Sequence, residues 1–219
     1  MYRYVVWDWN GTLLDDAWLS VEVINRMLAR RGLPLASPAR YARIFGFPLE
    51  DYCRRLGFDL EREPFAQLSD EFSSEYEARR LECQLRGGAE AVLRAVAGRG
   101  AIQAVLSAYE QQALRDLVVH FGLAGHFHDV VGVDNVHGSG KVALGRRWIG
   151  AIGWPPGQVL LVGDTLHDRD VAAAMGVDCA LIPSGHQERS RLEGQGVTVI
   201  EDLPHLLDLL AEGRHARET

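Results

Sequence analysis

The 219-residue sequence has only three cysteines and no long hydrophobic run. Cys53, Cys83 and Cys179 are an odd number with wide spacing, so they match neither a disulfide framework nor a zinc pattern. No apolar run approaches the length that crosses a bilayer, and no signal-peptide pattern is visible at the N-terminus. We therefore expect a soluble, cytoplasmic protein with reduced thiols and no membrane partner.

Positive charge is also scarce. Lys and Arg number 23 against 30 Asp and Glu, which gives a formal net charge of −7. Because nucleic-acid binding needs clustered Lys and Arg, we expect no nucleic-acid partner. A local basic pocket for a small anion is still allowed. The 47% of hydrophobic residues is enough to fill a globular core, and both a monomer and a homodimer are consistent with the sequence.

Six short apolar segments predict buried parallel strands. Their apolar residues are continuous and not alternating, as expected for strands that helices cover on both faces. Helical segments separate most of them from about residue 85 onward, which predicts an α/β fold with a doubly wound parallel sheet. The six segments are 4–9, 101–108, 129–133, 158–164, 179–183 and 197–201.

Residues 15–84 interrupt this alternation and contain no convincing strand. Their apolar spacing predicts four helices, and prolines stand near helix starts, where proline is tolerated. A segment of this length is too long for a loop. We therefore predict an inserted all-helical domain at 15–84, and an α/β core made of residues 1–14 and 85–219.

Polar side chains gather where the predicted strands end. Ligands bind at the carboxyl ends of the strands in open parallel sheets. Two carboxylates brought together there, such as Asp8 and Asp164, repel each other unless a cation lies between them, and carboxylate oxygens suit Mg²⁺. The polar residues at this edge are Asp8, Asn10, Ser107, Lys141, Asp164 and Asp168.

The same residues suit a phosphoryl group. Asp8 is placed to act as a nucleophile that forms an aspartyl-phosphate. Ser107 can hydrogen-bond a phosphoryl oxygen, and Lys141 can offset negative charge on the phosphate and the nucleophile. Gly11 and Thr12 add backbone N–H groups that can face an anion.

Four motifs in this order resemble those of the haloacid dehalogenase superfamily. The stretch DWNGTLLDD (8–16) is similar to D-x-D-G-T-L-x-D, and VLSA (105–108) resembles a strand that ends in Ser or Thr. Lys141 stands 23 residues before Asp164, and VGDTLHD (162–168) is similar to G-D-[ST]-x-x-D. The helical insert resembles the cap of the phosphoglycolate phosphatase-like branch. The resemblance implies a Rossmann-like core with this cap.

The resemblance also implies a role for each matching residue. Asp8 would be the nucleophile and a Mg²⁺ ligand, and Asn10 would bind Mg²⁺ through its backbone carbonyl. Asp164 would be a direct ligand, and Asp168 a direct or water-mediated one. The phosphoryl group would contact Gly11, Thr12, Ser107, Ala108 and Lys141.

Four further features keep two interpretations each. Asp15 matches the family's later acidic residue and suits the entry to the cap better than chemistry. His167 either points into the site or is exposed, whereas we assign Asp170 to the surface. The apolar stretch 41–52 either packs helix ends or closes over a substrate. The arginines that either contact a substrate or are surface charges are Arg40, Arg43, Arg54 and Arg55.

Asn10 departs from the first motif, in which the phosphatases of the family have a second Asp. The resemblance implies that this Asp protonates the leaving oxygen and then activates water. Asn has no titratable proton and can do neither. A minor alternative is that Asn10, which precedes Gly11, deamidates to Asp.

Three hypotheses about function follow. The first is a Mg²⁺-dependent phosphatase for a small phosphorylated metabolite, phosphoglycolate by resemblance. It would be slow or selective for aryl or acyl phosphates, or would use His167, Asp15 or a substrate group as its acid. The second is an impaired, phosphate-binding regulatory protein. The third is a metal-independent haloacid dehalogenase, which the retained acids Asp164 and Asp168 disfavour.

Overall fold

A six-stranded parallel sheet forms the centre of the protein, in the order β5-β4-β1-β6-β7-β8. The computed structural model describes residues 2–135, 140–183 and 185–215. The chain starts in the middle of the sheet, adds two strands on one side and then three on the other, so the predicted doubly wound sheet is confirmed. The strands are β1 Tyr4–Trp7, β4 Ile102–Glu110, β5 Asp129–Val133, β6 Val159–Gly163, β7 Asp178–Leu181 and β8 Thr198–Val199.

Helices cover both faces of the sheet, because alternate strand residues point to opposite sides. Val5 and Trp7 pack with apolar residues of α5, α6 and α10, whereas Val6 and Leu106 pack with those of α7 and α8. This burial on two faces explains the continuous apolar strands in the sequence. The helices are α5 Ala89–Gly98, α6 Gln111–His120, α7 Lys141–Ile152, α8 Leu166–Met175, the short α9 Arg189–Leu192 and α10 Leu206–His215.

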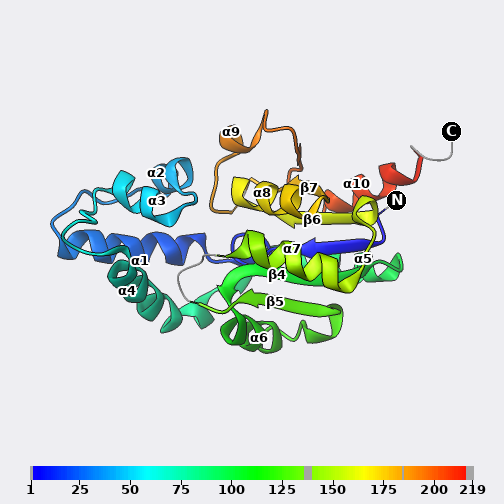
Figure 1. The fold of residues 1–219 in the computed structure, drawn as a ribbon, viewed down its shortest axis with the longest axis horizontal. Coiled ribbons are helices and arrows are strands. Elements are labelled where there is room, and N and C mark those ends of the chain that lie inside the picture. Colours follow the sequence, from blue (N-terminus) through cyan, green and yellow to red (C-terminus); the bar gives the residue numbers. More distant parts are fainter. Residues whose placement is uncertain (1, 136–139, 184, 216–219) are drawn as a thin grey trace.

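Four helices between β1 and β4 form a separate lobe beside the sheet (Figure 1). We call these helices the cap. Helix α1 buries Leu19, Val23 and Met27 on one face, and it packs against α4. The Ser37 hydroxyl caps α2 by accepting a hydrogen bond from the Arg40 N–H. The cap helices are α1 Ala17–Arg30, α2 Pro38–Ile44, α3 Leu49–Leu56 and α4 Phe65–Glu77.

A short antiparallel ribbon joins the cap to the core. Strand β2 (Leu14–Asp15) pairs with β3 (Gln84–Leu85), so the chain leaves and re-enters the core side by side. The expectation of no strand within 15–84 is therefore wrong at both ends. Two-residue strands are too short to show a two-residue alternation, which explains the omission. The domain boundaries at 14 and 85 stay a prediction.

The carboxyl ends of the central strands face the cap (Figure 1). Asp8 follows β1, Asp164 follows β6, and Ser107 lies near the end of β4. The sheet thus brings three distant segments to one edge, as expected at the switch point of a doubly wound sheet. No helix in the described ranges is both long and apolar enough to cross a membrane.

Candidate active site

Lys141 lies at the centre of the candidate site, between two carboxylates. Its Nζ atom is 2.7 Å from Oδ1 of Asp8 and 2.5 Å from Oδ1 of Asp168. It is the only lysine in the sequence, and only 2% of it is exposed. Asp168 is fixed from the other side, because Thr165 donates hydrogen bonds to Oδ2 from its backbone and its hydroxyl, as in a capping box.

Asp164 is held by two loops and is fully buried. The Thr12 hydroxyl donates to Oδ1 at 3.3 Å, and the His186 backbone N–H donates to Oδ2 at 2.5 Å. Gly11, with φ of 73°, and Gly185 both pass so close to Asp164 that a Cβ atom on either would overlap the carboxylate. Glycine is required at both positions because the backbone must approach the acid this closely.

Three carboxylates lie close together, and two of them contact the single ammonium group of Lys141. Asp8, Asp164 and Asp168 each offer an oxygen atom within 4.8 Å of the others. Burial and the Asp168 charge raise the pKa of Asp8 to about 8, and burial raises the pKa of Asp164 to about 6. Burial acts on Asp168 as well, but Lys141 outweighs it and lowers the pKa of that acid. The cluster thus carries more negative charge than Lys141 compensates.

The other residues predicted to contact a phosphoryl group fall into two sets. Ser107 and Ala108 line the cavity beside Asp8, and the Ser107 hydroxyl oxygen accepts a hydrogen bond from the Tyr109 N–H. The Gly11 N–H instead donates to Asp16 at 2.7 Å, and the Thr12 N–H donates to the Trp9 carbonyl. These two N–H groups are thus engaged within the protein, and their contact with a phosphoryl group stays a prediction. Thr12 contributes through its hydroxyl.

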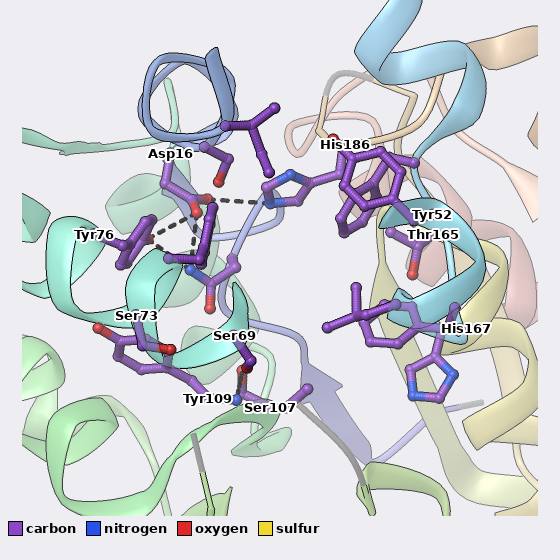
Figure 2. Close-up of a pocket in the computed structure, with 18 of the residues that line it drawn as sticks. Asp16, Tyr52, Ser69, Ser73, Tyr76, Ser107, Tyr109, Thr165, His167 and His186 are labelled. Atoms are coloured by element: carbon purple, nitrogen blue, oxygen red, sulfur yellow. Dashed lines mark hydrogen bonds and ion pairs between the residues drawn. The ribbon is translucent and has the colours of Figure 1, made fainter. Parts of the chain in front are cut away.

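Asn10 is fixed by an acid that the sequence analysis did not select. Its amide nitrogen donates to Oδ2 of Asp16 and to the Tyr76 hydroxyl, both at 2.9 Å. Tyr76 also donates to Asp16 (Figure 2). Only 1% of Asp16 is exposed. Burial alone would raise its pKa, yet His186, Asn10 and Tyr76 together lower it. Asp16 is thus a carboxylate that holds the amide.

His186 is the second residue that sequence reasoning missed. Its Nδ1 atom lies 2.7 Å from the Tyr41 hydroxyl of the cap, and its Nε2 atom lies 3.4 Å from Oδ1 of Asp16. Burial opposes the charged form, but Asp16 overcomes it and raises the pKa of His186 to about 9. His186 follows β7 at the carboxyl edge of the sheet, and that position is the signal that would have identified it.

The structure separates the remaining candidates. Asp15 is exposed on the ribbon, and its Oδ1 atom lies 3.6 Å from a guanidinium nitrogen of Arg86. The neighbouring Asp16 is buried. Asp170 is exposed, as predicted, and it pairs with Arg169. His167 lines the cavity and stacks on Phe47 with ring centroids 4.1 Å apart. Burial lowers the pKa of His167.

A cavity of about 360 Å³ opens from these residues into the cap. Figure 2 shows Tyr52 and His167 on one side of it and Tyr76 and Tyr109 on the other. The stretch 41–52 supplies lining residues, and its closure over a substrate stays a prediction. The four arginines that were interpreted either as substrate contacts or as surface charges are not in the lining of this cavity: Arg40, Arg43, Arg54 and Arg55.

Comparison with known proteins is consistent with this geometry. A family model of haloacid dehalogenase-like hydrolases matches residues 5–182. The tyrosine-protein kinase PtkA of Mycobacterium tuberculosis is 27% identical over 201 residues, covering 90% of this chain and 68% of its own. The phosphoglycolate phosphatase of Yersinia pseudotuberculosis is 27% identical over 218 residues, covering 95% and 91%. The structure of the haloacid dehalogenase-like protein SP0104 from Streptococcus pneumoniae superposes with a TM-score of 0.81 at 17% identity, covering 95% and 98%.

Proposed function

Because the chain belongs to the haloacid dehalogenase-like hydrolase family, we propose that it is a magnesium-dependent phosphatase acting through an aspartyl-phosphate on Asp8. The observation that carries this proposal is the contact of Lys141 with Asp8 and Asp168, beside Asp164, at the floor of a cavity. The names of both relatives above denote enzymes that act on phosphoryl groups, which supports the reaction class. The substrate would be a small phosphate monoester.

The acidic cluster fits a magnesium ion. Three buried carboxylates with one lysine leave an excess of negative charge, and oxygen ligands of this type suit Mg²⁺. Asp8, Asp164 and Asp168 would hold the ion, together with the predicted backbone carbonyl of Asn10. When bound, the ion would neutralise charge on the cluster and on the phosphoryl oxygens. The same excess charge counts against the metal-independent dehalogenase hypothesis.

The chain's own residues support two displacement steps. Lys141 holds Oδ1 of Asp8, and Oδ2 would attack phosphorus, so that an Asp8–phosphorus bond forms as the bond to the leaving oxygen breaks. The Ser107 hydroxyl and Lys141 would stabilise the phosphoryl oxygens. Water would then attack phosphorus, release inorganic phosphate and restore the Asp8 carboxylate.

Asn10 does not supply protons to these steps. Both hydrogens of its amide nitrogen are used by Asp16 and Tyr76, and an amide does not titrate near neutral pH. Asp16 is ionised and buried, so it is not placed as an acid either. Of the other candidate acids, Asp15 is exposed, and burial lowers the pKa of His167, which disfavours its protonated form. In the first step the leaving oxygen would therefore depart with little help from the enzyme.

Two measurements test the proposal. Phosphate release from acetyl phosphate should require magnesium, and Asp8→Asn should lower the rate at least about 10³-fold because the nucleophile is removed. Magnesium should also raise the melting temperature of the wild type but not of Asp164→Asn. Asp170→Asn is the matched control, because Asp170 is an exposed acid in the same segment. Equal rates for wild type and Asp8→Asn would reject the proposal.

A second candidate function is that of a regulatory protein with a long-lived aspartyl-phosphate. The amide at position 10 favours it, because no titratable group stands there to activate water for the second step. Intact-mass measurement after incubation with acetyl phosphate separates the two. A phosphoryl adduct on Asp8 that persists for hours supports the regulatory protein, and rapid turnover supports the phosphatase.

A further inference from the structure

The leaving part of the substrate would occupy the cap side of the cavity. The cavity runs from Asp8 and Lys141 to residues of α1, α3 and α4, and its volume of about 360 Å³ is within the range of sites for small organic ligands. A two-carbon acid attached to phosphate would fill only a small part of it. The chemistry of the cap side therefore indicates the chemistry of the leaving group.

Aromatic rings form two walls of this space. On the α2–α3 side, the Phe45 ring lies 5.1 Å from the Tyr41 ring and 5.2 Å from the Tyr52 ring, measured between centroids. On the opposite side, the Tyr76 ring lies between Phe72, at 5.8 Å, and Tyr109, at 6.1 Å. Figure 2 shows Tyr52 facing Tyr76 and Tyr109 across the space. Walls of this kind bind a flat apolar group.

The space offers no spare positive charge to a substrate anion. In the described part of the chain, Lys141 is the only lysine or arginine in the lining, and Asp8 and Asp168 already engage it. His186 lies against Asp16 and Tyr41. Besides Asp8, Asp16, Asp164 and Asp168, the described lining includes two more acids, Glu110 and Glu77, and Glu77 pairs with Arg80 outside the lining. A carboxylate or a second phosphate on the leaving group would lose its hydration without gaining an ion pair.

We propose, on the basis of the function proposed above, that the substrate is an aryl phosphate monoester whose aromatic part carries no negative charge. A phenol has a pKa of about 10, as in tyrosine, whereas water, a guide to a simple alcohol, has about 15.7. A phenolate therefore leaves with far less need of a proton. The aromatic walls and the amide at position 10 thus select the same substrate class.

The reaction balances without an added acid. Oδ2 of Asp8 forms a bond to phosphorus, and the bond between phosphorus and the phenolic oxygen breaks with its electron pair moving to that oxygen. The phenolate takes its proton from water after it leaves. A second water molecule then cleaves the Asp8–phosphorus bond and releases phosphate.

A substrate series tests this inference with the full-length wild type and magnesium. We expect kcat/KM for phenyl phosphate to exceed that for 4-carboxyphenyl phosphate and for phosphoglycolate by at least about tenfold each. The carboxyl group of 4-carboxyphenyl phosphate makes its phenol the better leaving group. A preference for phenyl phosphate over this substrate would therefore run against the intrinsic reactivity of the two esters. Benzyl phosphate, which has the same ring and an alcohol leaving group, should show a similar KM but a kcat at least about 10²-fold lower.

A charge added to the cavity should reverse part of this preference. Ser73 lines the cavity on α4, and the adjacent Ser74 is exposed and outside it. Ser73→Lys should raise the ratio of kcat/KM for 4-carboxyphenyl over phenyl phosphate at least about tenfold, since it supplies the missing cation. Ser74→Lys, the matched control, should leave the ratio within about twofold of the wild type.

Acetyl phosphate separates failure of the inference from failure of the proposed function. Its small acyl group uses Asp8 and Lys141 but not the aromatic walls. Hydrolysis of acetyl phosphate that depends on Asp8, combined with equal or better use of the carboxylated substrates, overturns the aryl substrate class and leaves the phosphatase intact. Absence of turnover on every substrate, acetyl phosphate included, overturns both.

Discussion

The amide nitrogen of Asn10 lies 2.9 Å from Oδ2 of Asp16 and donates a hydrogen bond to it. This contact gives a physical reason for an amide at position 10. An aspartate there would place a second carboxylate against a buried one, and two such groups at this distance cannot both ionise. Asn10 and Asp16 are therefore complementary and should be changed as a pair.

The pair predicts the outcome of restoring the acid. Asn10→Asp alone should raise kcat for benzyl phosphate by no more than about twofold, because Asp16 would disturb the new carboxyl group. The double variant Asn10→Asp/Asp16→Asn keeps a donor and an acceptor between the two residues. Its kcat for benzyl phosphate should exceed that of the single variant at least about tenfold, which is less than the rate gain that general acid–base catalysis usually gives. A gain of equal size in both variants would contradict the role of Asp16.

Lys141 should be essential to both activity and fold. Replacing it with Met leaves Asp8 and Asp168 buried without their shared partner, which typically destabilises a protein by about 3–5 kcal/mol. We expect phosphate release to fall at least about 10³-fold. Urea unfolding measures the change in the free energy of unfolding. If magnesium restores stability to Lys141→Met but not activity, the lysine acts on the phosphoryl group as well as on the acids; wild-type activity in this variant would contradict its catalytic role.

His186 should make stability depend on pH. Its pKa rises from 6.5 to about 9 in the folded protein because of Asp16. A group whose pKa is raised by folding stabilises the protein fully below about pH 6.5, and this contribution is lost as the pH rises towards 9, with an upper limit on the order of 3 kcal/mol. The melting temperature of the wild type should thus exceed that of His186→Gln by less at pH 9 than at pH 6.

A control and a contrary result define this pH experiment. His205 forms an exposed pair with Asp202, so His205→Gln should follow the wild-type melting curve throughout. Magnesium should be absent, because His186 contacts Asp164 through its backbone. A difference between the wild type and His186→Gln that stays constant from pH 6 to pH 9 would show that Asp16 does not hold the charged imidazole.

Two glycine-to-alanine substitutions distinguish an effect on magnesium binding from an effect on the stability of the fold. A Cβ atom at Gly185 would overlap Oδ2 of Asp164, so Gly185→Ala should displace that acid and weaken magnesium binding by about 10- to 100-fold. Gly150 is exposed in α7 and has open space around it. Gly150→Ala should raise the free energy of unfolding by about 0.5–1 kcal/mol and leave magnesium binding unchanged. Titration calorimetry with magnesium distinguishes the two, and wild-type affinity in Gly185→Ala would contradict the close approach.

The sequence predicted the residues that the parallel sheet itself positions. Asp8 and Asp164 come just past the carboxyl ends of buried strands, and Ser107 lies near the end of β4, so topology alone brings them to one edge. Lys141 is the first residue of α7, and Asp168 lies in the first turn of α8. Continuous apolar strands gave a clear pattern, which is why the doubly wound parallel sheet could be predicted.

The cap side of the site was harder to predict. Asp15 and Asp16 are adjacent acids, and no sequence pattern says which of them points inward. Asp15 ends the strand β2 and is exposed, whereas Asp16 is the N-cap residue of α1 and is buried. Tyr76 is an aromatic residue on an amphipathic helix, where packing is the ordinary role. His186 follows the fifth apolar segment, and the convergence argument applied to the other strands was not extended to it.

The single lysine has a practical consequence. Growth on ¹⁵N-lysine would place one labelled side chain in the whole protein, and that side chain is buried between Asp8 and Asp168. Its ammonium resonance would arise from the reaction centre alone, with no background from the surface. Substrate, phosphate, magnesium and pH would each be read from the position of one isolated peak.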